Sequence, residues 1–411
     1  MGFFDFFKRK ASASTPIHNY PGWGAPSMSG AVVTENRAMG LSAHFACVSL
    51  ISRIIASLPI HVYERTAAGG KKIRNDHPSA RLLRKKPNPE MTSFSMIEAM
   101  QAQILNRGKA FAELIFDKNG NVREIWPIAP GICEPKRKDK NSPIEYHFPN
   151  SGTILPAWKI LHVPGLGFDG INSFSPIQLF RQSLGLGLAL DEFGARFFGQ
   201  GTNIGSLLIH PKTLSKDAHE RLKTSLTEGF QGLSRSHKAI ILEEDMKFEK
   251  LGMPLEDAQF IESRKFTVSE MARIHGVPPH LIGDLEKATF SNIEEQGLNA
   301  VIYLFRPWII RWEQVLNNKL FTGEEEQDKY YIKFELDGLL RGNMKARYEA
   351  YSIGLQQGFL NADEVRELED MDPLPNGQGK IYRFPLNLAE AGKQIKELKR
   401  FTKLFGENKN D

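Results

Sequence analysis

Apolar side chains recur at helical spacing over residues 292–319, which predicts the longest helix of the fold. These side chains are Leu298, Val301, Phe305, Trp308, Trp312, Val315 and Leu316. A helix of this length would extend about 40 Å at 1.5 Å per residue, and Pro307 inside the pattern predicts a kink rather than an end. Asn292 and Glu295 resemble the capping pair that begins such a helix. Because other elements must cover so long an apolar face, the sequence predicts a sizeable folded core.

The composition supports this expectation and excludes several classes of protein. The 411 residues are 41% hydrophobic and 25% charged, which is typical of a folded, water-soluble chain of two or three domains. A net charge of +5 is small for this length and argues against a basic protein that coats DNA. The two cysteines, Cys47 and Cys133, can form neither a disulfide framework nor a four-cysteine zinc site. We therefore expect a reduced compartment.

The N-terminal segment leaves two alternatives open. Residues 1–10 are apolar first and basic afterwards, the reverse of a secretory signal, and Phe6 stands where a myristoylation signal has Ser or Thr. No run in the sequence approaches the ~20 apolar residues of a membrane-spanning helix. We expect a short helix that folds back onto its own chain or a neighbour, with docking to a membrane surface as the alternative. With the Ser-, Pro- and Gly-rich stretch that follows, residues 1–30 are predicted to form a flexible arm.

Residues 31–170 are predicted to form one domain of mixed helices and strands. The predicted elements are a helix at 38–57, a strand at 60–64, a short helix around 80–83, a helix at 93–107, and a hairpin of strands 110–116 and 122–126. Pro59 and Gly108 end the two long helices, and residues 117–120 have the composition of a turn. This arrangement predicts an α+β fold.

A glycine-containing helix is predicted from Pro176 to about residue 199, with Ser175 as its N-cap. Gly185, Gly187 and Gly194 lie in its interior, and each costs roughly 1 kcal/mol relative to alanine. Close approach of neighbouring helices is the physical reason that offsets this cost. A phosphate-binding loop is not expected, because the Walker lysine and the strand before the helix are missing.

The rest of the chain is predicted to contain a small insert, two helical regions and one returning strand. The predicted elements are a strand at 206–209, a helix at 215–230, a hairpin of 239–242 with 246–251, a helix at 255–275, a loop after Gly276 with Pro278, Pro279 and Gly283, a strand at 330–335, and a charged helical region at 339–411.

No catalytic motif stands out in the sequence. GxSxG, HExxH and Walker patterns are absent, and His275 and His280 are interpreted as ordinary solvated or hydrogen-bonded histidines rather than metal ligands. Glu243, Glu244 and Asp245 are expected at a solvated hairpin tip, with a partner-facing or cation-binding role as the alternative. A non-enzymatic assembly protein without cofactor or metal is therefore predicted. An enzyme acting on DNA or peptidoglycan remains the rival interpretation and would need a metal or carboxylate cluster.

An ordered series of short motifs resembles a known family. The motifs are Ala46–Ile51 with Leu58–Tyr63, Leu82–Leu83 with Pro87–Asn88, Asn106–Gly108 with Ala110–Glu113, Ile160–Val163, Ser175–Ile177, Asp257–Arg264, Gly276–Gly283, Thr289–Glu294 and Gly358–Arg366. In this order and spacing they resemble the portal proteins of long-tailed double-stranded-DNA bacteriophages, over residues 31–380. Arg107 departs from the histidine that is common in the family.

The resemblance implies a portal fold assembled as a ring of twelve subunits. Such a ring occupies one capsid vertex in the virion after assembly in the host cytoplasm, and it nucleates the procapsid. Double-stranded DNA enters through it under a terminase motor and later leaves through it. The implied partners are other copies of the chain, DNA without sequence specificity, the terminase large subunit, the major capsid protein, scaffold and a head-tail connector or adaptor, with no membrane anchor.

The resemblance also implies how the parts follow one another in the chain. They are the arm (1–30), a wing (31–173, with the strand 330–335), a first stem helix (174–202), a clip (203–253), a second stem helix (254–276), a tunnel loop (277–291), a long kinked helix with the return to the wing (292–338), and a helical crown with the C-terminal tail (339–411).

Candidate DNA-facing and partner-facing residues follow from this map. Lys287 in the tunnel loop is the first candidate for a phosphate contact, with pairing to Glu286 or Asp284 as the alternative. Weaker candidates in the stem are Arg181, Arg196, Lys265 and Arg273, for which salt bridges between subunits are the alternative. Pro278, Pro279, Gly283 and Thr289 are expected to shape the tunnel loop, and Glu243, Glu244 and Asp245 to face partners from the clip.

Overall fold

The computed structural model divides the chain into two compact units, Met1–Glu335 and Leu336–Asp411. It describes residues 26–66, 70–139, 141–200, 206–209, 216, 217, 220, 224, 247–250, 257–285, 296–336, 344–369 and 371–383. Both units are described separately below. The mixture of helices and antiparallel sheets confirms the predicted α+β class.

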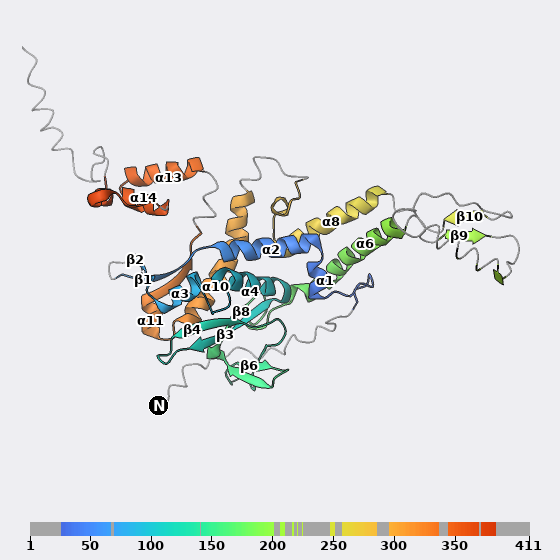
Figure 1. Cartoon of the computed structure of the whole chain (residues 1–411), viewed down its shortest axis with the longest axis horizontal. Helices are drawn as coiled ribbons and strands as arrows, with labels where there is room; N and C mark the ends of the chain where they lie inside the picture. The colour runs from blue at the N-terminus through green and yellow to red at the C-terminus, as the bar shows by residue number, and fades with distance from the viewer. Residues whose placement is uncertain are drawn as a thin grey trace, which may run out of the picture. The chain divides into compact units, whose positions relative to one another are not determined.

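Two long helices form one layer of the first unit (Figure 1). The helices of this region are α1 (Glu35–Met39), α2 (Ser42–Ser57), α3 (Pro78–Arg84) and α4 (Ser93–Arg107). The predicted helix at 38–57 is divided in two, because α1 ends at Gly40 and α2 begins two residues later. Buried side chains of α2, such as Ile51 and Ile55, pack against α4. The helix at 93–107 is confirmed at both ends, with Thr92 as its cap and Gly108 after its last turn.

Below α4 lies an antiparallel sheet whose order is β4-β3-β8. Its strands are β3 (Lys109–Phe116), β4 (Val122–Pro127) and β8 (Ile160–Pro164), with the 3₁₀ turn η2 (Ala157–Lys159) just before β8. The predicted hairpin of β3 and β4 is confirmed. Its turn is fixed by the Asp117 carboxylate, which accepts the backbone N–H groups of Asn119 and Asn121. A second sheet, β5 (Glu134–Lys136), β6 (Glu145–Phe148) and β7 (Thr153–Pro156), shares a core with the first through Phe111, Tyr146 and Ile160.

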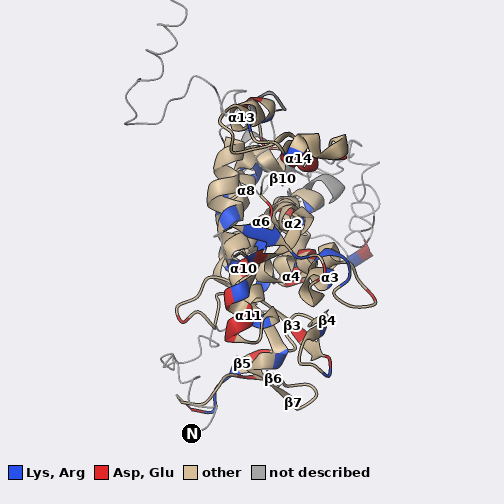
Figure 2. Cartoon of the chain, turned by 90° about the vertical axis from the view of Figure 1, so that its left-hand side faces the viewer, with Lys and Arg blue, Asp and Glu red and all other residues tan. Residues whose placement is uncertain are grey.

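A third sheet joins segments that are far apart in the sequence. Its order is β11-β1-β2, with β11 (Tyr330–Phe334), β1 (Ile60–Arg65) and β2 (Lys71–Ile73). The predicted strands at 60–64 and 330–335 are thus confirmed and pair antiparallel, with Val62 opposite Ile332. The short helix α11 (Glu324–Lys329) precedes β11 and carries acidic side chains, visible in Figure 2.

The long apolar stripe folds as a helix with a π-helical interruption. Helical residues begin at 296 in the described part, Val301–Phe305 (η4) form a π turn, and α10 spans Arg306–Leu320. Pro307 explains the interruption, because it has no N–H to donate and its ring displaces the carbonyl four residues earlier. The predicted capping residues Asn292 and Glu295 lie outside the described residues.

Side chains of α10 attach it to α4 and to β8. Trp312 is fully buried, and its indole N–H donates to Gln101 Oε1 at 2.8 Å. Lys319 Nζ donates to the carbonyl of Ala157 at 2.5 Å, and Arg311 donates to the carbonyl of Pro164. The helix therefore covers β8, which is an outer strand of its sheet.

Two further helices leave this core as a pair, α6 (Arg181–Gln200) and α8 (Asp257–His275), preceded by α5 (Pro176–Leu179). The helix predicted from 176 to 199 is divided at Phe180. Strand β9 (Ser206–Ile209) follows α6, and β10 (Lys247–Lys250) precedes α8. They pair antiparallel, with Ile209 opposite Lys247. The predicted strand 239–242 lies outside the described residues, so the structure does not describe the expected hairpin.

The second unit is built from α13 (Met344–Gln356), α14 (Ala362–Leu368) and the 3₁₀ segment η5 (Pro375–Lys380). Asn361 and Glu364 form a reciprocal capping box at the start of α14. The carboxylate of Glu369 holds the two helices together, since it pairs with Arg347 at 3.0 Å and accepts from the Tyr351 hydroxyl at 2.9 Å.

Candidate functional site

The α6–α8 pair packs antiparallel with a constant register. A Cβ placed on Gly187 would lie 3.0 Å from the Thr267 methyl, and one on Gly194 would lie 2.8 Å from the Phe260 ring. Ser183, one turn earlier on α6, donates to the Glu270 carboxylate at 3.0 Å. The predicted close approach of helices at these two glycines is therefore confirmed within one chain.

Gly185 has a different neighbour from the other two glycines. A Cβ at this position would lie 2.2 Å from the Ser27 hydroxyl oxygen, on the segment that precedes α1. The interpretation that all three glycines serve helix packing is therefore wrong for Gly185, because its face of α6 is turned toward an extended segment instead.

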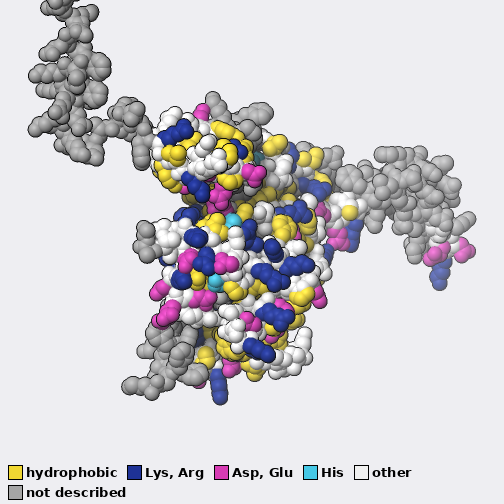
Figure 3. Space-filling model, turned by 60° about the vertical axis from the view of Figure 1, so that its left-hand side comes forward, with side chains coloured by type: hydrophobic (Ala, Val, Ile, Leu, Met, Phe, Trp, Pro, Cys, Tyr) yellow, Lys and Arg dark blue, Asp and Glu magenta, His cyan; other side chains and the backbone are white. Residues whose placement is uncertain are grey.

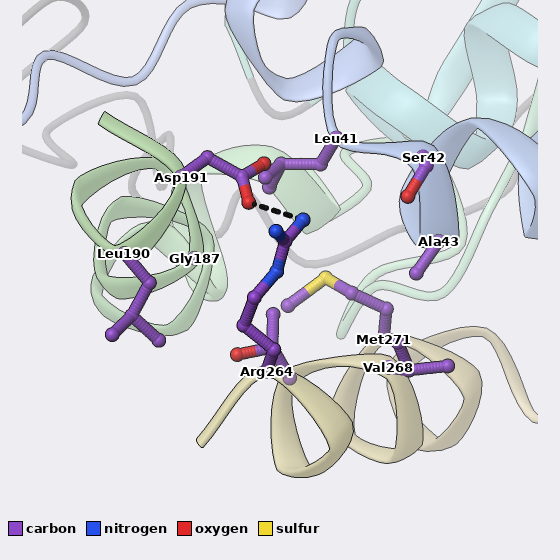
Figure 4. A pocket seen from close by; sticks show the side chains of 10 residues that line it. Leu41, Ser42, Ala43, Gly187, Leu190, Asp191, Arg264, Val268 and Met271 are labelled. Atoms are coloured by element: carbon purple, nitrogen blue, oxygen red, sulfur yellow. Dashed lines mark ion pairs between the residues drawn. The ribbon is translucent and has the colours of Figure 1, made fainter. Parts of the chain in front are cut away.

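A small pocket opens where α6 and α8 meet the start of α2 (Figure 4). Its volume is about 40 Å³, far below the ~300–1,000 Å³ of usual ligand sites. At its edge, Arg264 of α8 and Asp191 of α6 point toward each other and form an ion pair at 2.9 Å. Leu41, Leu184 and Met271 belong to the apolar cluster that joins the three helices. This geometry indicates a packing contact between helices rather than a site for a small molecule.

The motif Asn106–Arg107–Gly108 contacts the residues just before the start of α5. Gly108 adopts a left-handed conformation, with φ of 79°, and a Cβ there would lie 1.8 Å from the carbonyl oxygen of Phe174. Ser175 is positioned as an N-cap, but its hydroxyl makes no capping hydrogen bond and instead donates to the carbonyl of Asn106 at 3.1 Å. The predicted capping role of its side chain is therefore wrong, because the hydroxyl is used for a contact between elements.

The side chain of Asn106 begins a buried hydrogen-bond chain that reaches α8. His44 of α2 lies 2.9 Å from Asn106 Oδ1 through its Nε2, and His275 Nε2 lies 3.1 Å from His44 Nδ1. Burial lowers the pKa of His44, and burial followed by the nearby His44 lowers the pKa of His275 to about 3. Both rings are therefore neutral near pH 7. His275 is a hydrogen-bonded histidine, in line with its interpretation from the sequence.

The loop after α8 starts from this buried position with a defined backbone. Gly276 is left-handed, with φ of 67°, and the N–H of buried Val277 donates to the carbonyl of Ala272 at 2.9 Å. The residues expected to form an irregular loop instead include a 3₁₀ turn, η3 (Pro279–Ile282), which ends at left-handed Gly283. Pro278 and Pro279 begin this turn and Gly283 ends it, while Thr289 lies outside the described residues.

The structure places only part of the predicted DNA-facing set. Arg181 is half-buried at the start of α6, and Arg273 is exposed near the end of α8, where the antiparallel register brings the two to the same level. Arg196 lies about 22 Å farther along α6 and pairs with Glu192 of its own helix at 2.5 Å. Lys265 is exposed in the middle of α8. The four residues therefore do not form one cluster.

Five other predicted residues have no described position. Lys287, Glu243, Glu244, Asp245 and the already mentioned Thr289 lie outside the described residues. Conversely, the sequence interpretation did not single out His44 or Asn106 as important residues. Asn106 lies in a recognised motif, which was the available signal, but nothing in the spacing of the sequence brings His44 next to His275.

The described surface carries both signs of charge. Basic and acidic side chains are interspersed over the face shown in Figure 3. Among the described residues, no group of three His, Cys, Asp or Glu side chains could hold a metal ion. No helix in that part of the chain combines the length and the apolar character needed to cross a bilayer.

Comparison with known proteins gives matches over most of the chain. The family model described as "Phage portal protein" matches residues 42–370. A probable portal protein of Streptomyces phage phiC31 is 34% identical over 391 residues, which cover 90% of this chain and 83% of that protein. The portal protein of Enterobacteria phage HK97 is 32% identical over 351 residues, which cover 84% and 82% of the two chains.

The fold is also similar to that of a solved particle component. A chain in the neck of a native gene transfer agent particle, computed with C12 symmetry, matches with a TM-score of 0.55 and 21% identity. The match covers 86% of this chain and 97% of that one.

Proposed function

The chain belongs to the phage portal protein family and has a portal function, and we propose that its copies close into a ring around a channel for double-stranded DNA. The observation that carries this proposal is the family match over residues 42–370, which includes α2, α4, the α6–α8 pair and α10. The likeness to a neck component with C12 symmetry supports twelve subunits. The ring would occupy one vertex of the capsid in the virion and assemble in the host cytoplasm.

Closure of a ring needs two different faces on each subunit, one docking on the other. The α6–α8 pair offers outward faces of mixed character, since large apolar residues such as Leu186, Ile261 and Phe266 are exposed between charged ones. We assign the stem of the ring to this pair, residues 174–202 and 254–276, and the wing to the sheet domain at 31–173 with β11.

The channel would contact DNA without reading its sequence, because a conduit must pass every base pair alike. A net charge of +5 on 411 residues suits this role, since a bore that held each phosphate with arginine would bind too tightly to let DNA move. We propose Lys287 of the tunnel loop (277–291) as a phosphate contact. Arg181 and Arg273, which lie at one level of the stem, are the secondary candidates.

The remaining assignments concern partners of the assembled ring. The clip (203–253) would meet the terminase large subunit during packaging and the connector afterwards, through Glu243, Glu244 and Asp245. The major capsid protein and scaffold are further proposed partners of the ring. The portal family is a structural one, and no observation among the described residues favours a catalytic function.

Ring formation is the first expected outcome. Mass photometry of the purified full-length protein should give a dominant species near twelve times 46.4 kDa, and negative-stain images should show annular particles. A chain that stays monomeric at micromolar concentration, even together with its scaffold protein, would contradict the proposed ring.

The Lys287→Glu variant is expected to package less DNA than wild type in an assay with terminase and procapsids, while still forming rings. The reason is that a carboxylate in the channel repels the phosphates that the lysine attracts. Lys118→Glu, at the exposed β3–β4 turn, makes the same change of charge elsewhere and should package normally. Normal packaging by Lys287→Glu would remove Lys287 from the channel.

A further inference from the structure

The start of the first stem helix and the end of the second are linked by one buried series of hydrogen-bonded polar groups. The hydroxyl of Ser175, just before α5, donates to the backbone carbonyl of Asn106. The side chain of the same residue holds His44, and His44 holds His275, the last residue of α8. His44, Asn106 and His275 are between 1% and 9% exposed. One asparagine thus connects α4 to the start of the first stem helix and to the end of the second.

The Asn106 amide determines the donor and acceptor of each hydrogen bond between Asn106, His44 and His275. The amide Nδ2 of Asn106 donates to the carbonyl of Ala102 at 2.8 Å, so its Oδ1 is the acceptor for His44. His44 must then donate from Nε2 and accept at Nδ1, which requires His275 to donate from Nε2. A proton added to His44 would occupy Nδ1 and remove the only acceptor that His275 has there.

We propose that Asn106, His44 and His275 position the loop after α8, and that protonation of the two histidines releases it. The loop begins directly after these three hydrogen-bonded residues, because Gly276 follows His275 and Val277 is buried beside α8. The inference that such a release would act on the DNA channel rests on the proposed function of that loop. The release itself does not.

Among the described residues, the charged side chains on the elements beside the pair have other partners or lie at the surface. On α8, Glu270 accepts from Ser183 of α6 and Arg273 is exposed. Beside Asn106, Arg107 pairs with Glu35 of α1. Burial raises the pKa of the Cys47 thiol, one turn along α2, to about 12, so it stays neutral. His280 and Asp284 are the titratable groups of the following loop segment.

The sign of the pH effect follows from these values. Burial holds the pKa of both histidines below the usual histidine value of about 6.5, and that of His275 at about 3. The two neutral histidines therefore stabilise the closed loop fully above about pH 6.5. This stabilisation declines as the pH falls from about 6.5 toward about 3. At pH 5.5, protonation of His275 on opening increases the opening equilibrium about tenfold relative to pH 7.5, and the lowered pKa of His44 acts in the same direction.

Amide hydrogen exchange of the full-length protein tests this proposal. Peptides covering 276–285 contain hydrogen-bonded amides, including those of Val277, Leu281 and Asp284, and peptides from the first half of α4, away from Asn106, serve as an internal reference. Exchange times at pH 7.5 and 5.5 are scaled to the intrinsic exchange rate. We expect protection of 276–285 to fall at least about tenfold more than that of α4 at the lower pH.

Two variants separate the histidine pair from general acid sensitivity. In His275→Gln, an amide can still donate to His44 but does not titrate, so the differential loss should shrink by about tenfold. In His162→Gln, a buried histidine of the sheet domain is replaced, whose pKa burial also lowers to about 3. This control should keep the wild-type response of 276–285.

The outcomes decide the proposal without reference to DNA. Equal protection changes in 276–285 and α4, or a His275→Gln variant that responds like wild type, would overturn it. If the protein shows the expected exchange response but forms no rings, the pH-dependent release by His44 and His275 is supported. The proposed function as a DNA channel is then contradicted.

Discussion

The Gly108→Ala variant is expected to lose about 2 to 5 kcal/mol of unfolding free energy and to lose its ring assembly. Two physical costs coincide at this residue. The left-handed backbone, with φ of 79°, disfavours any side chain, and the new Cβ would lie 1.8 Å from the Phe174 carbonyl oxygen. Because the backbone fixes the position of the Cβ and the carbonyl oxygen is itself a backbone atom, α5 must move away from α4. Urea unfolding followed by circular dichroism measures the loss.

Gly120→Ala is the matched control for this prediction. Gly120 has nearly the same backbone conformation, with φ of 84°, but nothing lies within 4 Å of its Cβ position. Its replacement should cost only the conformational part, roughly 1–2 kcal/mol, and should leave ring assembly intact. Equal losses in the two variants would mean that the contact with Phe174 contributes nothing.

The Trp312→Ala variant is expected to be destabilised by about 3–5 kcal/mol. Trp312 is the largest of the fully buried side chains and lies between α10 and α4. Its removal would leave a cavity and would also deprive buried Gln101 Oε1 of its donor. Thermal and urea unfolding, compared with wild type, test this expectation.

A second substitution at the same position separates packing from hydrogen bonding. Trp312→Phe keeps an aromatic ring and removes the N–H, so about 1–3 kcal/mol is expected from the unpaired amide oxygen. Trp158→Ala provides the surface control, because Trp158 is 57% exposed and should change stability by less than about 1 kcal/mol. A Trp312→Ala protein as stable as Trp158→Ala would contradict the placement of α10 in the core.

Local signals predicted most of the elements around the candidate site. The helix at 93–107 was predictable because apolar residues recur along it and Gly108 supplies the left-handed stop. The β3–β4 hairpin followed from the turn at Asp117, whose carboxylate binds the backbone of the turn itself. In each case the determining contacts lie within a few residues, where spacing and residue type are informative.

Contacts between distant segments could not be predicted in the same way. Gly187 and Gly194 indicated a close neighbour, but not that Thr267 and Phe260 of the same chain would fill the space. Ser175 has the composition of a cap, yet its hydroxyl bonds to Asn106, which lies 69 positions away. His44 and His275 are separated by 231 positions, so no periodicity relates them. The π turn before Pro307 likewise depends on how one helix relieves a local clash.

The way α10 covers β8 has a consequence for a protein present in many copies. An outer strand with free carbonyl groups can recruit the same strand of another molecule, and such pairing has no natural limit. Arg311 donates to the carbonyl of Pro164 at the end of β8, Lys319 donates to the carbonyl of Ala157 in the turn before the strand, and α10 packs against β8. In the folded chain, α10 thereby hinders the addition of a further strand at this edge of the sheet.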